Sequence, residues 1–498
     1  MQASQGVGAQ NGQARPFGQA LPLGQAAAPR GDAIQSVGFF FVCVLLFLLF
    51  SRVQEQIPLL TKMSSVFVAG LLAMGAGLMT GGVYYVVRAR QGIYLLSFTC
   101  WLVLATITSN WKSGSLALLT DMWVKSLWAF LAVGAGIATL RQCKNAMYVM
   151  GVSLFVVEVI TTLVGRDEYG RLGVGDVGTL ANANVLAFHI VFLFPCLLLA
   201  MLHAGRVWKL LAIPVMIYGI FLVLQTGSRG GLIEIALVSL FIFIRLGAGQ
   251  KIVFTVVALA AVSVGVGMAS KDALARYRTL FTDEIDSSSF VSATASQMQR
   301  KYLLEQSLQM TFQHPLLGVG PGVFLSTLAG EEAKDGRASA WRNTHNAYTQ
   351  LSSETGLPGF LLFMAALLSC MGLNFRTYRK YRGRVETQDR SDVAYGLLIM
   401  LAIWTANGPF DSNAYQYYMP VLVGLTVALA RAGQTSPVAA PVPMFRQSWA
   451  VPLPVMAGAE SKAISPSQNT TPKTPQVKSP GLKMTRYSVR PGDRRGEG

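Results

Sequence analysis

Three basic side chains of this 498-residue chain, Arg229, Arg300 and His345, have surroundings that could support chemistry. Arg229 lies in the stretch Gln225-Thr-Gly-Ser-Arg-Gly-Gly231, between two apolar runs. A guanidinium group can hold phosphate oxygens in a bidentate way, and the two glycines that follow allow a ligand to approach the backbone. The next apolar run predicts a helix whose N-terminus also favours an anion. The alternative is an arginine that extends from a helix end to the membrane interface.

His345 sits between Asn343 and Asn346, just before another apolar run. A histidine among polar neighbours can act as a base near neutral pH, although a solvated surface group has the same appearance in sequence. Glu354 is a carboxylate that could orient it. Nine residues separate the two, which puts them on opposite faces of one helix, so we do not expect a direct pair.

Arg300 opens the segment 298–312, which contains apolar residues at four-residue intervals. Leu304, Leu308 and Phe312 follow this spacing, with Tyr302 and Met310 nearby. The pattern predicts an amphipathic helix of the kind that can lie along a membrane surface. Arg300 is then either an anion contact or a charge on the solvated face.

Arg171 is likewise either an anion contact or a solvated charge. It lies in the Gly- and Asn-rich loop 170–184, which leads into an apolar run. We expect this loop to be a re-entrant or close-packed polar segment. Among the acidic residues, Asp283, Glu284 and Asp286 have the residue types of a carboxylate metal cluster. Their weak spacing and their Ser and Thr neighbours favour a solvated loop instead.

Two further carboxylates, Glu158 and Glu234, lie inside apolar runs, where such groups indicate a proton relay or an ion pair that fixes the helices. The sequence has no Walker loop, no HExxH, no GxSxG and no zinc-type Cys and His spacing. Nucleotide hydrolysis and metalloprotease chemistry therefore have no support.

The composition of the chain indicates that membrane helices position these residues. Apolar residues form 52% of the chain and charged residues only 13%, which argues against a disordered protein and an ordinary soluble enzyme. About twelve apolar runs can each cross a membrane as a helix. They cover 34–50, 63–82, 92–109, 122–140, 146–164, 185–203, 208–226, 230–246, 252–269, 357–375, 393–409 and 415–431.

The predicted fold class is thus an all-α integral membrane protein. Transmembrane helices 1–9 occupy 34–269 and helices 10–12 occupy 357–431, with a long loop, 270–356, between them. Loops of that length are usually functional. The segments 1–33 and 432–498 have the composition of disordered tails, and the second is rich in Pro, Ser and Lys.

The net charge of +17 comes largely from alternate loops. One set of loops holds fourteen basic residues: Arg88, Arg90, Arg141, Lys144, Arg206, Lys209, Arg245, Lys251, Arg376, Arg379, Lys380, Arg382, Arg384 and Arg390. The short loops of the opposite set hold six: Arg52, Lys62, Lys112, Arg166, Arg171 and Arg229. The positive-inside rule predicts that the first set and both termini are cytoplasmic, with the long loop on the periplasmic side. The charge then indicates topology, and no nucleic-acid partner is expected.

Several motifs together resemble the O-antigen ligase and O-antigen polymerase superfamily. Their order along the chain is Arg171 to Asn184-Val-Leu-Ala, Thr226-Gly-Ser-Arg-Gly-Gly, His314-Pro-Leu-Leu-Gly-Val-Gly-Pro-Gly, Thr344-His-Asn-Ala-Tyr and Glu354-Thr-Gly-Leu-Pro-Gly. These motifs span roughly 165–375, and the layout of spans covers 34–431. One departure is Asn182-Ala-Asn184, where the family often has a proline before the second Asn.

The resemblance implies a polytopic GT-C-like glycosyltransferase that moves a glycan from an undecaprenyl diphosphate carrier to an acceptor at the periplasmic face of the inner membrane. It implies catalytic roles for His345, Arg229 and Arg300. Expected substrate-binding residues are Arg171, Asn184, Asn346, Tyr348 and Glu354. No metal or cofactor is needed if the arginines supply the positive charge, and direct attack would invert the anomeric centre.

The sequence does not distinguish among three possible acceptors of the glycan. A ligase would use a lipid A core, a polymerase another carrier-linked glycan, and a protein O-glycosylating enzyme a Ser, Thr or Tyr. The alternative from another class is a transporter or flippase of lipid-linked sugars that uses Glu158 and Glu234, although no internal repeat of the kind common in transporters is evident.

Overall fold

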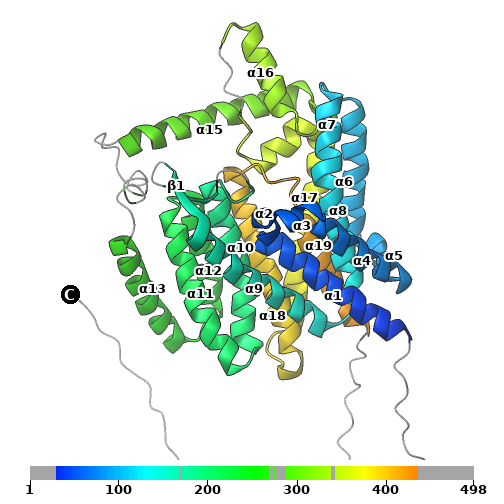
Figure 1. Ribbon diagram of the computed structural model, residues 1–498, viewed down its shortest axis with the longest axis vertical. Helices are drawn as coiled ribbons and strands as arrows, with labels where there is room; N and C mark the ends of the chain where they lie inside the picture. Colours follow the sequence, from blue (N-terminus) through cyan, green and yellow to red (C-terminus); the bar gives the residue numbers. More distant parts are fainter. Residues whose placement is uncertain are drawn as a thin grey trace, which may run out of the picture. The chain divides into compact units, whose positions relative to one another are not determined.

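Helices account for most of the chain that the computed structural model describes (Figure 1). The metal-cluster candidates Asp283, Glu284 and Asp286 lie outside the described residues, as do most of both predicted tails and part of the long loop. The described residues are 30–168, 171–175, 178–268, 274, 277, 288–337 and 342–435.

The first half of the bundle consists of ten helices and a π-helical turn, Leu119–Trp123, that joins α7 to α8. The helices are α1 (Arg30–Ser51), α2 (Val53–Gln56), α3 (Pro58–Lys62), α4 (Ser65–Met79), α5 (Gly82–Arg88), α6 (Arg90–Ile107), α7 (Lys112–Leu118), α8 (Val124–Gly136), α9 (Leu140–Val164) and α10 (Ala183–His203). The second half contains α11 (Arg206–Gln225), α12 (Arg229–Arg245), α13 (Ala248–Met268), α15 (Ser288–Gln313), α16 (Phe324–Lys334), α17 (Ala347–Tyr381), α18 (Gln388–Asn407) and α19 (Tyr418–Thr435).

The chain is an all-α membrane protein. Within the described residues, eight helical segments are long and apolar enough to cross a bilayer, and the pair α4 and α5 would make a ninth. Every predicted apolar run contains a helix, but α12 has only 17 residues and the apolar parts of α13 and α19 are also short. The count of twelve spans therefore stays a prediction.

The run 63–82 is not the single straight helix that its hydropathy predicts. The axes of α4 and α5 differ by 92°. The break occurs at Gly81, whose φ of 68° is a left-handed conformation that ends α4. Gly82 then packs so tightly that a Cβ atom would lie 2.3 Å from the carbonyl oxygen of Ala135 in α8.

The polar loop after α9 is partly a β-hairpin, which is a small exception to the all-α prediction. β1 (Gly165–Glu168) pairs antiparallel with β2 (Arg171–Val174), and Gly165 lies opposite Val174. The amide of Val174 donates to the carbonyl of Leu180, so the hairpin folds back toward the start of α10.

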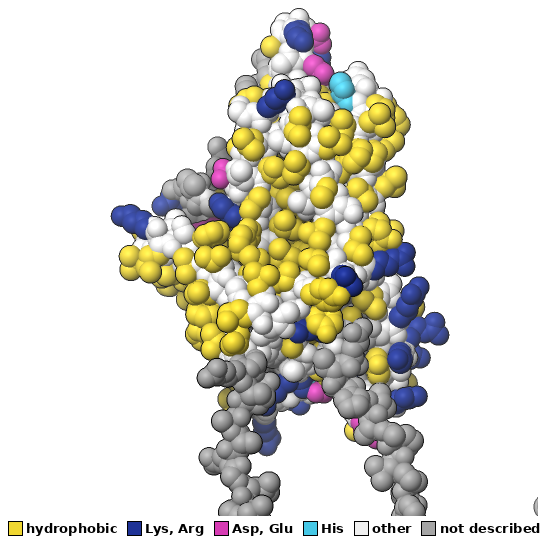
Figure 2. Space-filling view, turned by 90° about the vertical axis from the view of Figure 1, so that its right-hand side faces the viewer, with side chains coloured by type: hydrophobic (Ala, Val, Ile, Leu, Met, Phe, Trp, Pro, Cys, Tyr) yellow, Lys and Arg dark blue, Asp and Glu magenta, His cyan; other side chains and the backbone are white. Residues whose placement is uncertain are grey.

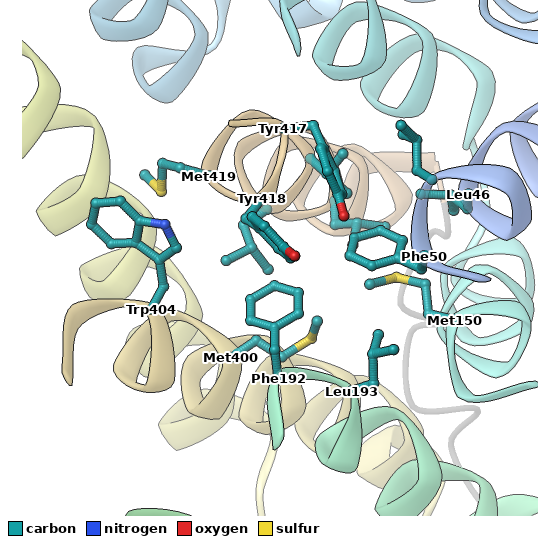
Figure 3. Close-up of a cluster of buried hydrophobic side chains, with 14 of the residues drawn as sticks. Leu46, Phe50, Met150, Phe192, Leu193, Met400, Trp404, Tyr417, Tyr418 and Met419 are labelled. Carbon is teal, nitrogen blue, oxygen red and sulfur yellow. The ribbon is translucent and has the colours of Figure 1, made fainter. Parts of the chain in front are cut away.

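An aromatic cluster fills the centre of the bundle, where α1, α10 and α19 meet (Figure 3). Phe50 stacks on Phe192 with ring centroids 5.9 Å apart, and the rings of Tyr417 and Tyr418 stack at 4.5 Å. His189 is buried here, and its two ring nitrogens lie 2.7 Å from the Tyr418 hydroxyl and 2.8 Å from the Phe50 carbonyl. This histidine is fully bonded inside the core and has a structural role.

The basic loops meet at one end of the bundle, around two aspartates at the start of α18. Asp389 contacts Lys144, and its carboxylate lies 2.9 Å from His203 Nδ1. Asp392 lies 2.8 Å from His203 Nε2 and 2.7 Å from Arg245. Figure 2 shows a broad hydrophobic band with many Lys and Arg side chains gathered below it. We call this the basic end.

Candidate functional site

A cavity of about 430 Å³ lies at the opposite ends of α10, α12 and α18 from the basic end. It brings together six of the residues that the sequence singles out, from five separate elements: Arg171, Asn184, Arg229, Arg300, His345 and Asn346. Ser228, Thr344, Asn407 and Phe410 complete much of its wall. Glu158 and Glu234 are buried in α9 and α12 and do not line it.

The cavity wall is strongly cationic. Arg171, Arg229, Arg300 and Lys301 line it, and the described residues of the wall include no carboxylate. Positive charges gathered in one partly enclosed space raise the local concentration of an anion and favour its binding. The arrangement therefore fits an anionic ligand.

Three helix N-termini converge on the same cavity. Asn184 is in the first turn of α10, Arg229 is the first residue of α12, and Asn346 caps α17. All three residues line the wall. Helix N-termini carry partial positive charge and unpaired amide groups, so they add to the attraction that the arginines exert on an anion.

A tight turn places Arg229 at this position. Gly227 has a φ of 59°, and the Ser228 hydroxyl caps α12 by accepting from the Gly231 amide at 3.3 Å. A Cβ atom on Gly231 would lie 2.9 Å from Val223 and 3.0 Å from Ala187, so this glycine allows α12 to pack against α10 and α11. Only Gly230 of the pair faces the cavity.

The hairpin supplies Arg171. Its Nη2 donates to the Asn184 side-chain oxygen at 2.7 Å, and its Nε donates to the Thr226 carbonyl at 3.1 Å. Arg171 thus joins β2, α10 and the turn before Arg229. Arg171 therefore organises the wall as well as lining it.

His345 is held in a constrained turn. Its φ of 49° is unusual for a residue other than glycine. On one side, the Thr344 hydroxyl lies 2.8 Å from that of Ser412, and on the other the Asn346 side chain accepts from the amides of Tyr348 and Thr349. Both neighbours are anchored, so the histidine is presented to the cavity in a fixed place.

The charge state of His345 suits a base. Burial lowers its pKa below the ordinary value, and the positive charges of Arg300 and Arg342 lower it further. The imidazole is therefore neutral at pH 7 and has a lone pair available to accept a proton.

Asp411 is a candidate functional residue that the sequence reasoning missed. It follows Phe410 of the cavity wall, and its Oδ1 accepts from the Ser412 amide at 2.8 Å. Burial raises its pKa, whereas the Ser412 amide, the charge of Arg300 and the Asn407 side chain oppose that rise. Arg300 therefore interacts electrostatically with both His345 and Asp411. The available signal is the polar stretch Asn407-Gly-Pro-Phe-Asp411 between two apolar runs.

Tyr348 and Glu354, two of the expected substrate-binding residues, do not contact the cavity. The Tyr348 hydroxyl donates to the Thr405 carbonyl at 2.7 Å, and its ring packs against Gly408, so it ties α17 to α18. Glu354 is buried, and its carboxylate accepts from the amides of Gly322 at 2.9 Å and Phe324 at 3.4 Å. Neither residue lines the cavity.

Glu354 instead fixes the Gly- and Pro-rich turn between α15 and α16. The backbones join as well, because the amides of Val319 and Gly320 donate to the carbonyls of Ser353 and Glu354. The turn must be glycine-rich because Gly320 has a φ of 115° and a Cβ there would lie 2.1 Å from the Ser109 hydroxyl. These hydrogen bonds hold the C-terminal end of α15 against α17. Because Arg300 lies on α15, they also help to position it.

The family comparison agrees with this geometry. The O-antigen ligase family matches residues 214–364, a range that contains Arg229, Arg300 and His345. The match supports the O-antigen ligase superfamily for this part of the chain. A comparison with curated proteins gives no match. The match indicates an activity of the O-antigen ligase or polymerase type in a multi-pass membrane protein, with glycans as substrates. Arg171, Asn184 and Asp411 lie outside the matched range, so their place in the site rests on the structure alone.

Proposed function

We propose that the cavity binds the diphosphate of an undecaprenyl-diphosphate-linked glycan and transfers the glycan to an acceptor hydroxyl. The observation that carries the proposal is the convergence of Arg171, Arg229 and Arg300 with the N-termini of α10, α12 and α17. A diphosphate has several oxygens that these groups can bind at once, in the bidentate geometry that arginine favours.

The proposed chemistry is a direct displacement. The acceptor oxygen forms a bond to the anomeric carbon, while the bond from that carbon to the diphosphate oxygen breaks and its electron pair leaves with the phosphate. His345 accepts the proton of the acceptor hydroxyl, a contribution of roughly 10²–10⁴-fold. Arg229 and Arg300 stabilise the growing negative charge, at a few kcal/mol for each fixed donor. One such displacement inverts the anomeric centre.

Transfer is proposed to be independent of metal ions because arginines and helix ends supply the positive charge. A chelator such as EDTA should then leave the reaction unchanged. A requirement for added Mg²⁺ would instead direct attention to Asp283 and Asp286 in the long loop.

The basic end is proposed to face the cytoplasm together with both termini, and the cavity to face the periplasm. The short loops at the basic end contain fourteen Lys and Arg against six in the short loops of the opposite side, as the positive-inside rule requires. The aspartates at that end offset part of the charge, but the rule counts basic residues and not net charge.

The acceptor separates three versions of the proposal, and we place the lipid A core or a second carrier-linked glycan first. A deletion strain distinguishes them through its surface glycans. Long chains that accumulate without attachment to lipid A indicate a ligase, and single units without long chains indicate a polymerase. Normal lipopolysaccharide with unglycosylated proteins indicates a protein acceptor, and an unchanged glycan profile would contradict the proposal.

A further inference from the structure

α15 has two apolar faces, and the bundle covers only one of them. Leu303 and Met310 are buried against Val323 and Phe324, beside the turn that Glu354 holds. Thr311 on the same side lies 2.9 Å from the Ser352 hydroxyl of α17. These contacts attach one side of α15 to the protein.

The second apolar face is the row that the sequence spacing picks out, and it stays exposed. Leu304 is 37% exposed, Leu308 40% and Phe312 74%, and Leu316 in the following turn is 68% exposed. We call these four residues the α15 stripe. Residues four apart in a helix are displaced by only about 40° around the axis, so the three helical members share a side.

The two ends of the stripe lie near the start of α12 and the break in α17. At one end, Leu304 lines the cavity beside Arg229 and Gly230, at the start of α12. At the other end, the carbonyl of Pro315 accepts from the Leu357 amide at 2.8 Å, just after the break in α17 at Gly356. The stripe therefore runs from the N-terminus of α12 to the break in α17.

Exposed apolar side chains continue from the stripe down α17. Leu357, Leu361 and Leu368 are all exposed on this helix, which is one of those long and apolar enough to cross a bilayer. In a membrane protein, such residues contact lipid chains. The stripe is thus continuous with the exposed apolar surface of a helix that is suited to cross the bilayer.

We propose that the α15 stripe lies in the outer part of the bilayer leaflet at the cavity end, so that α15 is an interfacial helix that packs on the protein with one face and on lipid with another. The remaining surface fits that position, because Glu305, Gln309 and Gln313 form an exposed polar row. Lys301, 78% exposed, has a long stem that allows its ammonium group to reach lipid phosphates.

An interfacial position of α15 would bring the cavity close to the lipid leaflet. Arg300 and Leu304 lie on the cavity side of α15, and the same side carries Leu308 toward the lipid. The leaflet would therefore hold α15 at a fixed height above α12. A lipid-linked ligand in the leaflet would then meet the cationic wall without leaving the membrane surface.

The test measures what surrounds single positions of the full-length protein in vesicles of phosphatidylethanolamine with a minor fraction of phosphatidylglycerol. Nitroxide labels are placed at Leu308→Cys and Phe312→Cys, with Glu305→Cys and Gln309→Cys as matched controls on the polar row of the same helix. The five native cysteines, Cys43, Cys100, Cys143, Cys196 and Cys370, are free and are replaced first. Collisions with oxygen, which enriches in lipid, are compared with collisions with a water-soluble nickel chelate.

The stripe positions should show a severalfold larger ratio of oxygen to nickel collisions than the controls. Equal ratios in the two rows would overturn the proposal, because the stripe would then face water. Protection from both reagents, together with spin–spin broadening, would also overturn it by showing that a second copy of the chain covers the stripe.

A second measurement keeps the native cysteines. Benzophenone phenylalanine at position 312 should form photo-adducts with the phospholipid, and the same residue at Gln309 should form far fewer. Lipid adducts at equal yield from both positions, or none from position 312, would contradict the proposal. Neither readout depends on glycan transfer, so its outcome is independent of the proposed function.

Discussion

Arg171 and Asn184 are joined by a 2.7 Å hydrogen bond that links the hairpin to the N-terminus of α10 at the cavity wall. Because the same guanidinium also donates to the Thr226 carbonyl, one side chain connects three of the segments that form the site. The position of Arg229, three residues after Thr226, therefore depends on a residue more than 50 positions earlier in the chain.

Arg171→Lys should lower kcat/KM for glycan transfer about tenfold, equivalent to about 1.4 kcal/mol. A lysine keeps the charge but cannot donate to both Asn184 and Thr226 in the same planar geometry. Steady-state kinetics on the purified variant measure the effect, with Arg166→Lys in β1 as the matched control. The geometric role is refuted if the two variants have the same kcat/KM.

His345→Ala should reduce the rate of transfer by roughly 10²–10⁴-fold without unfolding the protein. His314→Ala is the control, because His314 is exposed and does not line the cavity. Turnover close to that of the wild type in the His345 variant would remove this residue from the mechanism.

The pH dependence of wild-type transfer should reflect the lowered pKa of His345. The base form is populated above that pKa, so the rate should be independent of pH around neutrality and fall only below the ordinary histidine value of about 6.5. Stability should change in the same direction. Because the unfolded chain takes up the proton at a higher pH than the folded protein, the free energy of unfolding decreases as the pH falls through this window.

Arg300→Ala should lower the rate by 10²-fold or more and move the acid limb of the remaining activity to higher pH. The first effect follows from losing a fixed charge beside the leaving group. The second follows because Arg300 lowers the pKa of His345, so its removal lets that pKa rise. Rate against pH for both proteins checks the shift, with Arg337→Ala on the exposed loop surface as the control. An acid limb that stays in place, or moves to lower pH, would show that Arg300 does not act on His345.

Glu354→Gln should reduce the free energy of unfolding by about 1–3 kcal/mol while leaving KM for the donor nearly unchanged. Its carboxylate accepts from two backbone amides of the turn, and the amide group of glutamine cannot reproduce both bonds. Thermal unfolding and donor titration separate these readouts, with the exposed Glu305→Gln as the control. An increase in KM without a loss of stability would instead support the substrate-binding role expected from the sequence.

The residues that the sequence singles out and the structure brings to one cavity have recognisable surroundings in the sequence. Arg229 and His345 are polar groups at the margins of apolar runs, where charge is costly unless it has a function or reaches water. Arg300 opens an amphipathic segment of the long loop. The sequence also separates His345 from Glu354. In the structure His345 lies in the turn before α17, whereas Glu354 lies within the first part of this helix, before the break at Gly356, and bonds to the turn between α15 and α16.

The positions of the residues that lie away from the cavity, or that the sequence does not single out, depend on tertiary contacts that local spacing does not encode. Tyr348 and Glu354 belong to the same motif as His345, but the face each occupies is set by packing against α18 and by the turn near Gly320. Asp411 has no motif around it and enters the site only because the segment between α18 and α19 folds beside Arg300. The sequence does not predict the hairpin of β1 and β2, because strands of four residues produce little periodic signal.

The most direct test of the central claim uses purified full-length protein, a defined undecaprenyl-diphosphate-linked glycan, an acceptor glycan and EDTA. The measured quantity is the glycan product formed together with undecaprenyl diphosphate released. We expect one molecule of each per turnover for the wild type and for Arg337→Ala, with at least a 10²-fold loss for the correctly folded Arg229→Ala variant. Undiminished product formation by Arg229→Ala, or no product without a divalent metal, would contradict it.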